Sequence, residues 1–399
     1  MAQNTIPLEE IRLLASGLFD ETVRVRRDIH AHPELGFSEE RTAGIAASCL
    51  SELGIEVFTG VAKTGVVGVL DGKTPGRTLL LRADMDALPL QELADVAFRS
   101  RVPGVMHACG HDGHTAVLIS AARLLARLRD RLKGRVVFVF QPAEENLGGA
   151  KAMIDEGAFS GLGIEAALGL HLITLLPCGT VGLRPGPFMA SVDLFRALIL
   201  GEGGHGAMPG GSVDAIEIAA KVVSGLKAHL AGAITPGGRP LVNIGTIKGG
   251  TAPNIVADTV ELEGTVRCMD DDARPALRQA MEAFLESVAK DAGGSYELAY
   301  TDGYPILVND HHMTDIVRRT AQDLLGETRV FELEPTMASE DMAFFLRMVP
   351  GCFFFVGAGF GDPAMDYPHH SPRFVLNEDS LLVALQVLCT AAVRFLEGA

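Results

Sequence analysis

The chain has 399 residues, of which 48% are hydrophobic and 21% charged, so it can bury a large core and is neither disordered nor fibrous. It is longer than the roughly 250–300 residues that one hydrophobic core usually serves, which predicts two domains. A formal net charge of −16, without any run of basic residues, disfavours binding to nucleic acid or to anionic membranes.

Two further features bear on the class of protein. The first ten residues lack the basic start and apolar segment of a secretory signal, so we expect a cytoplasmic protein. The six cysteines are scattered without a CxxC pair, so no disulfide framework is expected. The most apolar stretch, 161–183, contains Glu165, His171 and Pro177, which favours buried strands over a membrane helix.

Helical and strand patterns alternate over the first half of the chain. Apolar spacing predicts a helix over 8–30, beginning after Pro7, and a second over 38–53, with Ser38 as N-cap and a stop at Gly54. A further helix is predicted over 115–129, and β-rich runs lie at 65–70, 78–82, 135–140 and 166–172. This alternation is typical of an α/β sheet layered by helices.

The pattern changes near 184–187. Strand-like runs at 192–200, 241–247, 255–266 and 296–301 are interleaved with helical runs at 214–230 and 272–289. This β-α-β-β-α-β order predicts helices packed on one antiparallel sheet. We therefore expect an inserted domain at 187–302, between segments 1–186 and 303–399 of the main domain. The last segment returns to strands at 330–333 and 352–356 and ends in a helix over 377–396.

Residues 106–114 place three histidines, a cysteine and an aspartate just before a helix. A thiolate and an imidazole two residues apart on non-helical backbone, as in Cys109 and His111, can bind one ion together. His107 and His114 have two readings. Either could orient a ligand through its second nitrogen, or simply cap the helix.

Carboxylates follow two of the predicted buried strands. Glu144 and Glu145 are adjacent on extended backbone and project to opposite sides, so one can bind a metal while the other faces a water molecule. Asp84 and Asp86 face one side, and one of them could orient a metal-bound histidine or bind the metal itself. We count Asp86 among the catalytic residues.

Two more histidines complete the set of candidate ligands. His171 stands at the end of a predicted buried strand, where ligands gather in open α/β sheets. Late in the chain, either His369 or His370 is held between two prolines. Five ligands exceed the four of a structural zinc site, which favours an open catalytic site with two metals. The five are Cys109, His111, Glu145, His171 and one of His369 and His370.

Motifs spread over nearly the whole chain resemble those of the M20 metallopeptidase family. The similarity is to its amidohydrolase branch, which includes hippurate hydrolase, N-acyl-amino-acid aminoacylases and plant auxin-conjugate hydrolases. The motifs are His30-x-His32-Pro33-Glu34-Leu35, 83–89, 106–114, 141–145, Gly204-His205, 249–254, 264–267, Ser339-Glu-Asp341 and His370-Ser-Pro372.

The resemblance implies a zinc-peptidase-like, three-layer α/β catalytic domain interrupted by an inserted α+β sandwich that serves as lid or dimerisation domain. It implies a two-metal site in which Glu144 is the general base, and it selects His370 over His369. The implied ligands are Cys109, His111, Glu145, His171 and His370. The metals are expected to be two divalent ions, with manganese, zinc, cobalt and nickel all compatible.

The resemblance also assigns roles to the inserted domain. His205 is similar to a residue that reaches the partner subunit's site and stabilises the developing oxyanion, so a homodimer or higher homo-oligomer through the inserted domain is expected. Asn254 and Arg267 match positions that hold the substrate carboxylate. Two departures leave the acyl-group specificity open. Gly210 stands where relatives have a second histidine, and Glu202 where lysine is common.

The predicted function is therefore metal-dependent hydrolysis of the amide bond of N-acyl or N-aroyl amino acids. A dipeptidase or aminopeptidase using the same metals is the first alternative. A binding or structural metalloprotein is the second, but it would have no use for Glu144 beside a ligand. Hydrolytic deamination of an aromatic amine is the third.

Overall fold

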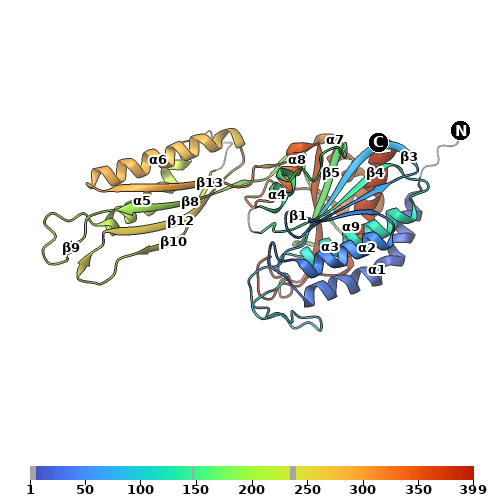
Figure 1. Ribbon diagram of the computed structural model, residues 1–399, viewed down its shortest axis with the longest axis horizontal. Helices are drawn as coiled ribbons and strands as arrows, with labels where there is room; N and C mark the ends of the chain where they lie inside the picture. Colours follow the sequence, from blue (N-terminus) through green and yellow to red (C-terminus); the bar gives the residue numbers. More distant parts are fainter. Residues whose placement is uncertain (1–5, 146–147, 234–239) are drawn as a thin grey trace. The chain divides into compact units, whose positions relative to one another are not determined.

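The computed structural model describes residues 6–145, 148–233 and 240–399, which form two compact units (Figure 1). The first unit comprises Met1–Phe188, Val308–Glu334 and Asp341–Ala399. The second comprises Met189–Leu307 and Pro335–Glu340. The sequence pattern predicts 335–340 in the main domain, whereas this segment belongs to the second unit, because the amide of Ala190 donates to the carbonyls of Thr336 and Ala338.

The first unit is built on an eight-stranded sheet in the order β1-β2-β4-β3-β5-β16-β6-β15. Its four middle strands, β4, β3, β5 and β16, run parallel, so their carboxyl ends meet at one edge. The strands are β1 (Glu56–Val61), β2 (Gly65–Asp71), β3 (Thr74–Asp84), β4 (Lys133–Gln141), β5 (Ala166–Pro177), β6 (Val181–Leu183), β15 (Val330–Glu332) and β16 (Gly351–Gly359).

Helices cover both faces of this sheet. One face shares its core with α1 (Leu8–Ala31), α2 (Glu40–Glu52), α3 (His111–Arg127), α7 (His311–Leu325) and α9 (Asp379–Glu397). The short helices α4 (Gly149–Asp155) and α8 (Met342–Met348) pack together against β4, β5 and β16. The predicted α/β class, with a large central sheet between helical layers, is confirmed (Figure 1).

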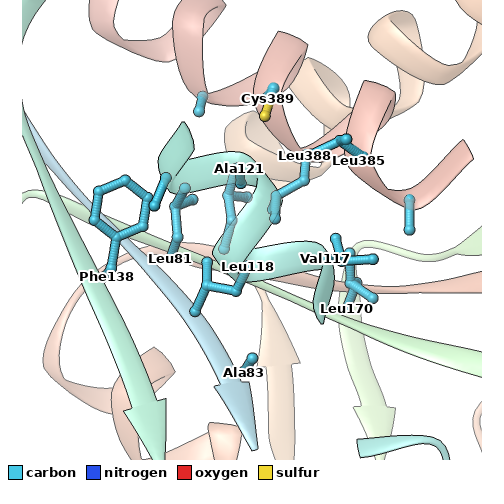
Figure 2. Close-up of a cluster of buried hydrophobic side chains, with 14 of the residues drawn as sticks. Leu81, Ala83, Val117, Leu118, Ala121, Phe138, Leu170, Leu385, Leu388 and Cys389 are labelled. Atoms are coloured by element: carbon cyan, nitrogen blue, oxygen red, sulfur yellow. The ribbon is translucent and has the colours of Figure 1, made fainter. Parts of the chain in front are cut away.

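The strand pattern explains the layering. Alternate residues of β3, such as Leu81 and Ala83, enter the core beneath α3, to which α3 contributes Val117 and Leu118 (Figure 2). Helix α9 closes this core with Leu385 and its neighbours. By length and composition, α9 alone among the described helices could cross a membrane, but 72% of its most apolar window is buried in this unit.

The second unit has an antiparallel sheet in the order β10-β12-β8-β13, with α5 and α6 sharing its core. The elements are β8 (Ser191–Leu200), α5 (Ala215–Ala231), β10 (Leu241–Gly249), β12 (Thr259–Cys268), α6 (Arg274–Asp291) and β13 (Ser295–Asp302). A separate two-stranded antiparallel sheet pairs β9 (Gly204–His205) with β11 (Ile255–Val256), so the single strand predicted over 255–266 is in fact two. Strands β7 (Gly186–Met189) and β14 (Leu307–Asn309) pair with each other.

Three predicted details are wrong, and each correction bears on the site. Helix α2 begins at Glu40 without a side-chain cap, so Ser38 is not its N-cap. Helix α3 begins at His111, not at residue 115, because Gly110 before it adopts a φ of 94° and turns the chain into the helix. Strand β5 continues to Pro177, so His171 lies within it and not at its end.

Candidate active site

The carboxyl ends of β3 and β4 bring the predicted acidic residues to one place. Asp84, the last residue of β3, pairs with Gln141, the last residue of β4. The chain then continues from β3 to Asp86 and from β4 to Glu144 and Glu145. Strand β5 lies on the other side of β3 and carries His171 two residues beyond Gly169, which pairs with Arg82.

All five predicted ligands lie at this edge in overlapping groups. The ligand atoms of Cys109, His111 and His171 lie within 4.8 Å of one another, as do those of Cys109, Glu145 and His370. Cys109 Sγ is 3.4 Å from His171 Nε2, and His370 Nε2 is 2.9 Å from Glu145 Oε1. The ligand atoms of His111, Glu144 and Glu145 form a third such group.

The structure distinguishes the two late histidines. His370 has a φ of 64°, which is unusual for a residue with a side chain, and its ring meets Glu145. His369 instead donates from Nε2 to the carbonyl of Leu172 at 2.9 Å and packs edge-on against the ring of His171. The geometry therefore brings His370, and not His369, to the candidate ligands.

Two of the imidazoles are held with one nitrogen available. His171 donates from Nδ1 to the carbonyl of Leu172 at 2.8 Å, and His111 donates from Nδ1 to the carbonyl of Asp86 at 2.9 Å. Each Nε2 therefore keeps its lone pair. In the described part of the chain, the buried Nε2 of His111 has no hydrogen-bond partner. A buried acceptor without a partner is costly, and a bound cation would satisfy it.

The thiol of Cys109 supports the same interpretation. Burial and the charge of Glu145 raise its pKa well above the usual range. A thiolate at this position therefore requires a nearby positive charge. The combined thiolate, imidazole and carboxylate donors suit a divalent transition metal ion. The residues present fit a metal centre.

Cys109→Ser is expected to lower the metal content of the protein, because a hydroxyl is a far weaker ligand than a thiolate. Elemental analysis after dialysis against a fixed free metal concentration measures the effect. Cys178→Ser is the matched control, since Cys178 is also a free, partly buried cysteine. Equal metal content in both variants and the wild type would exclude Cys109 from the ligand set.

Asp86 contacts three groups of the site at once. Its Oδ1 accepts from the amide of Glu144 at 3.1 Å, and its Oδ2 accepts from the amide of Glu145 at 3.0 Å. His111 Nδ1 lies 3.2 Å from the same Oδ1. Asp86 is buried, so this carboxylate holds the backbone of both glutamates and the ring of His111 in place.

His114 lies in the first turn of α3 and makes two hydrogen bonds. Its Nδ1 lies 2.6 Å from Asp84 Oδ1, and its Nε2 accepts from the amide of Leu172 at 2.9 Å. Both nitrogens are occupied by protein groups, and His114 thereby connects α3 to β3 and β5. His107 is buried, and neither of its nitrogens has a hydrogen-bond partner among the described residues. Burial lowers the pKa of His107 to about 3.

A buried ion-pair network around Arg82 of β3, which the sequence pattern does not reveal, connects to Asp84 at the site. Arg82 Nη1 donates to Asp84 at 2.7 Å, and its Nη2 donates to Asp341 at 2.7 Å. Its Nε donates to Gln141 at 2.7 Å. The run of apolar residues before Arg82 concealed this role, because a charged residue inside a predicted strand shows its partners only when distant segments are brought together.

The second unit carries the three remaining candidates. His205 lies on β9 and Asn254 directly precedes β11, its partner strand, and the amide of Gly206 donates to the Asn254 carbonyl at 2.9 Å. Both side chains are exposed, and His205 Nδ1 accepts from the amide of Ala207 at 3.1 Å. The structure thus brings His205 and Asn254 together.

Arg267 lies on β12 and is partly buried. Its Nη1 donates to the carbonyl of Met337 at 3.0 Å and to Ser339 Oγ at 2.8 Å. No carboxylate pairs with Arg267 within the described ranges, and burial lowers its pKa. The guanidinium therefore keeps donors available for an anion.

Comparison with known proteins shows what the chain is similar to. Residues 80–394 match the model of peptidase family M20/M25/M40. The chain is 36% identical to an N-acetyl-L-cysteine deacetylase of Bacillus subtilis, over 96% of this chain and 90% of that protein. It is 38% identical to thermostable carboxypeptidase 2 of Saccharolobus solfataricus, over 97% of this chain and 98% of that protein.

A solved structure is also similar. The YXEP protein of Bacillus subtilis, described as a dinuclear metal binding peptidase from the M20 family, superposes with a TM-score of 0.83 at 35% identity. The match covers 96% of this chain and 100% of that one.

Proposed function

The chain belongs to peptidase family M20/M25/M40, and from this membership we propose that it is a metal-dependent amidohydrolase that releases an amino acid from its N-acyl or N-aroyl derivative. One observation carries the proposal most directly. The carboxylate of Glu144 lies beside the ligand group of His111 and Glu145, where a purely structural metal site would need no additional acid.

The residues present would hold two divalent ions, as in the related dinuclear peptidase. The proposed ligands are Cys109, His111, Glu145, His171 and His370. When bound, such ions supply Lewis acidity for attack of water on an amide carbonyl. The donor set accommodates zinc, manganese, cobalt or nickel.

The chain's own groups perform the proton transfers. Glu144 takes a proton from the attacking water and later delivers it to the nitrogen of the leaving amine, so the C–N bond breaks without releasing an amide anion. Asp86 holds the Glu144 amide and the His111 ring and acts as a positioning residue. We propose that His205 stabilises the oxyanion, and that Asn254 and Arg267 bind the substrate carboxylate.

A homodimer through the second unit belongs to the same proposal. Strand β10 is an edge strand of its sheet, and α5 exposes apolar side chains at Ile216 and Val223. Both features leave a surface that a second copy of the chain can cover. A cytoplasmic location and small-molecule substrates complete the proposal.

The substrate class is tested by a screen after metal reconstitution. N-acetyl, N-benzoyl and indole-acetyl amino acids are supplied alongside unblocked dipeptides, and the released amino acid is quantified. The proposal predicts turnover of at least one blocked series. Turnover restricted to unblocked dipeptides would support the dipeptidase or aminopeptidase alternative.

Arg267→Ala is expected to lower kcat/KM for an N-acyl amino acid. The loss of a buried carboxylate contact corresponds to about 2–5 kcal/mol less stabilisation of the transition state. The matching C-terminal amide lacks the charge that Arg267 would bind, so its hydrolysis should fall much less. Arg196→Ala on neighbouring β8 is the control, because Arg196 is exposed and pairs with Glu261. Equal losses on acid and amide would show that Arg267 supports the fold and does not recognise the carboxylate.

A further inference from the structure

The turn that carries the two glutamates is held by carboxylates from outside. Three successive amides, those of Ala143, Glu144 and Glu145, each donate to a carboxylate oxygen. Asp86 accepts from the last two, as described above. The first is bound by Glu39, whose Oε1 accepts from the Ala143 amide at 2.9 Å.

Ala143 requires such a restraint. Its φ is 52°, in the left-handed region that costs an alanine roughly 1–2 kcal/mol. Because Ala143 immediately precedes Glu144, relaxation of its backbone toward the usual φ would redirect both following side chains. The direction of the catalytic carboxylates therefore depends on what holds Ala143.

The contacts of the buried Glu39 carboxylate are to hydrogen-bond donors of Ala143 and Thr64. The Glu39 side chain is fully buried, and its carboxylate accepts from the amide of Ala143 and the hydroxyl of Thr64. No ion pair to Glu39 occurs in the part of the chain that the structure describes. Burying an acid without a cation is costly, so this carboxylate does not serve stability in the way that an ordinary salt bridge would.

Strained backbone is concentrated around the same contacts. The described non-glycine residues with positive φ are Phe37, Ala62, Lys63, Ala143 and His370. Phe37 lies two residues before Glu39, and Lys63 directly precedes Thr64. The Lys63 ammonium lies 4.7 Å from the centre of the Phe37 ring. Such conformations persist where the surroundings fix them, and they cluster at active sites.

We propose that Glu39 is a positioning residue for the catalytic carboxylates. It acts through the Ala143 amide to hold the turn that aims Glu144 and Glu145, and Thr64 orients it. This inference rests on the proposed function for its kinetic consequence, but the structural restraint can be measured without activity.

The kinetic test uses the full-length, metal-saturated enzyme. Glu39→Ala is expected to lower kcat about 10–100-fold, as for other misplaced catalytic groups, with KM changed less than about threefold. Glu39→Gln should recover most of the loss, because its amide oxygen can still accept from Ala143. Glu40→Ala is the control, since Glu40 is the exposed neighbour.

A double substitution tests the route through Ala143. Glycine adopts positive φ without steric cost, so adding Ala143→Gly to Glu39→Ala should restore part of kcat. The proposal would be overturned if metal-saturated Glu39→Ala had the wild-type kcat and only a lower stability. A loss that neither Glu39→Gln nor Ala143→Gly reduces would also overturn it.

Hydrogen exchange of the 141–145 segment in the metal-free protein gives the independent measurement. The Ala143 amide should exchange at least tenfold faster in Glu39→Ala and at the wild-type rate in Glu40→Ala. Unchanged exchange refutes the restraint, even if the wild type hydrolyses no amide at all.

Should Glu39→Ala fail to fold, Thr64→Val removes the hydroxyl donor with little change in shape, and faster exchange with a smaller fall in kcat is expected. The wild-type exchange rate and kcat in Thr64→Val would then overturn the proposal.

Discussion

Glu144→Gln is expected to abolish most activity, with kcat falling by at least the factor of about 10²–10⁴ that a general base contributes. Glutamine has nearly the same shape but cannot take a proton from water. The Asp86 carboxylate accepts from the backbone amide of residue 144, so this contact does not involve the Glu144 side chain and should persist in the variant. Steady-state kinetics on a reactive N-acyl amino acid measures the loss.

Metal content separates this effect from a damaged site. Glu144→Gln should bind as much metal as the wild type, whereas Glu145→Gln should bind less, because only Glu145 is proposed as a ligand. Turnover close to the wild-type rate in Glu144→Gln would remove Glu144 from the mechanism. Metal loss in both variants would instead assign both carboxylates to the ligand set.

Arg82→Met is expected to destabilise the first unit by about 3–5 kcal/mol, because it leaves buried carboxylates without their cation. The side chains of Arg82, Asp84 and Asp341 are all fully buried. The chain has no tryptophan, so urea unfolding of the metal-free protein is followed by far-UV circular dichroism.

The exposed ion pair on the next strand is the control. Arg135 on β4 pairs with Asp71 at 2.7 Å, with both side chains partly exposed. Arg135→Met should cost less than about 1 kcal/mol. If Arg82→Met and Arg135→Met lower the free energy of unfolding equally, burial does not make loss of the Arg82 network more costly than loss of an exposed ion pair.

The positions of the candidate site residues after β4 and before α3 could be predicted, because they depend on sequence patterns confined to short segments. An apolar run followed by polar residues marks where β4 delivers Glu144 and Glu145, and the spacing of Cys109 and His111 is confined to one loop. The α/β class and the order of elements in the second unit follow equally from residue periodicity.

Features that depend on distant contacts could not be predicted in this way. Residue types alone left His369 and His370 equivalent, and their difference comes from a turn in which His370 has positive φ. In the sequence, Glu39 is only an acid near the start of the helix predicted over 38–53, where the helix dipole favours a carboxylate. Its burial depends on Thr64 and Ala143, which are distant in the chain, and no local pattern records these contacts.

Anomalous diffraction from crystals grown with manganese or zinc tests the central claim most directly. Two anomalous peaks per chain are predicted, each within bonding distance of the candidate ligands that gather at one edge of the central sheet. Together the peaks should account for Cys109, His111, Glu145, His171 and His370, with Glu144 adjacent but unbound. A single peak, or two peaks that omit these side chains, would contradict the assignment of a two-metal hydrolytic centre.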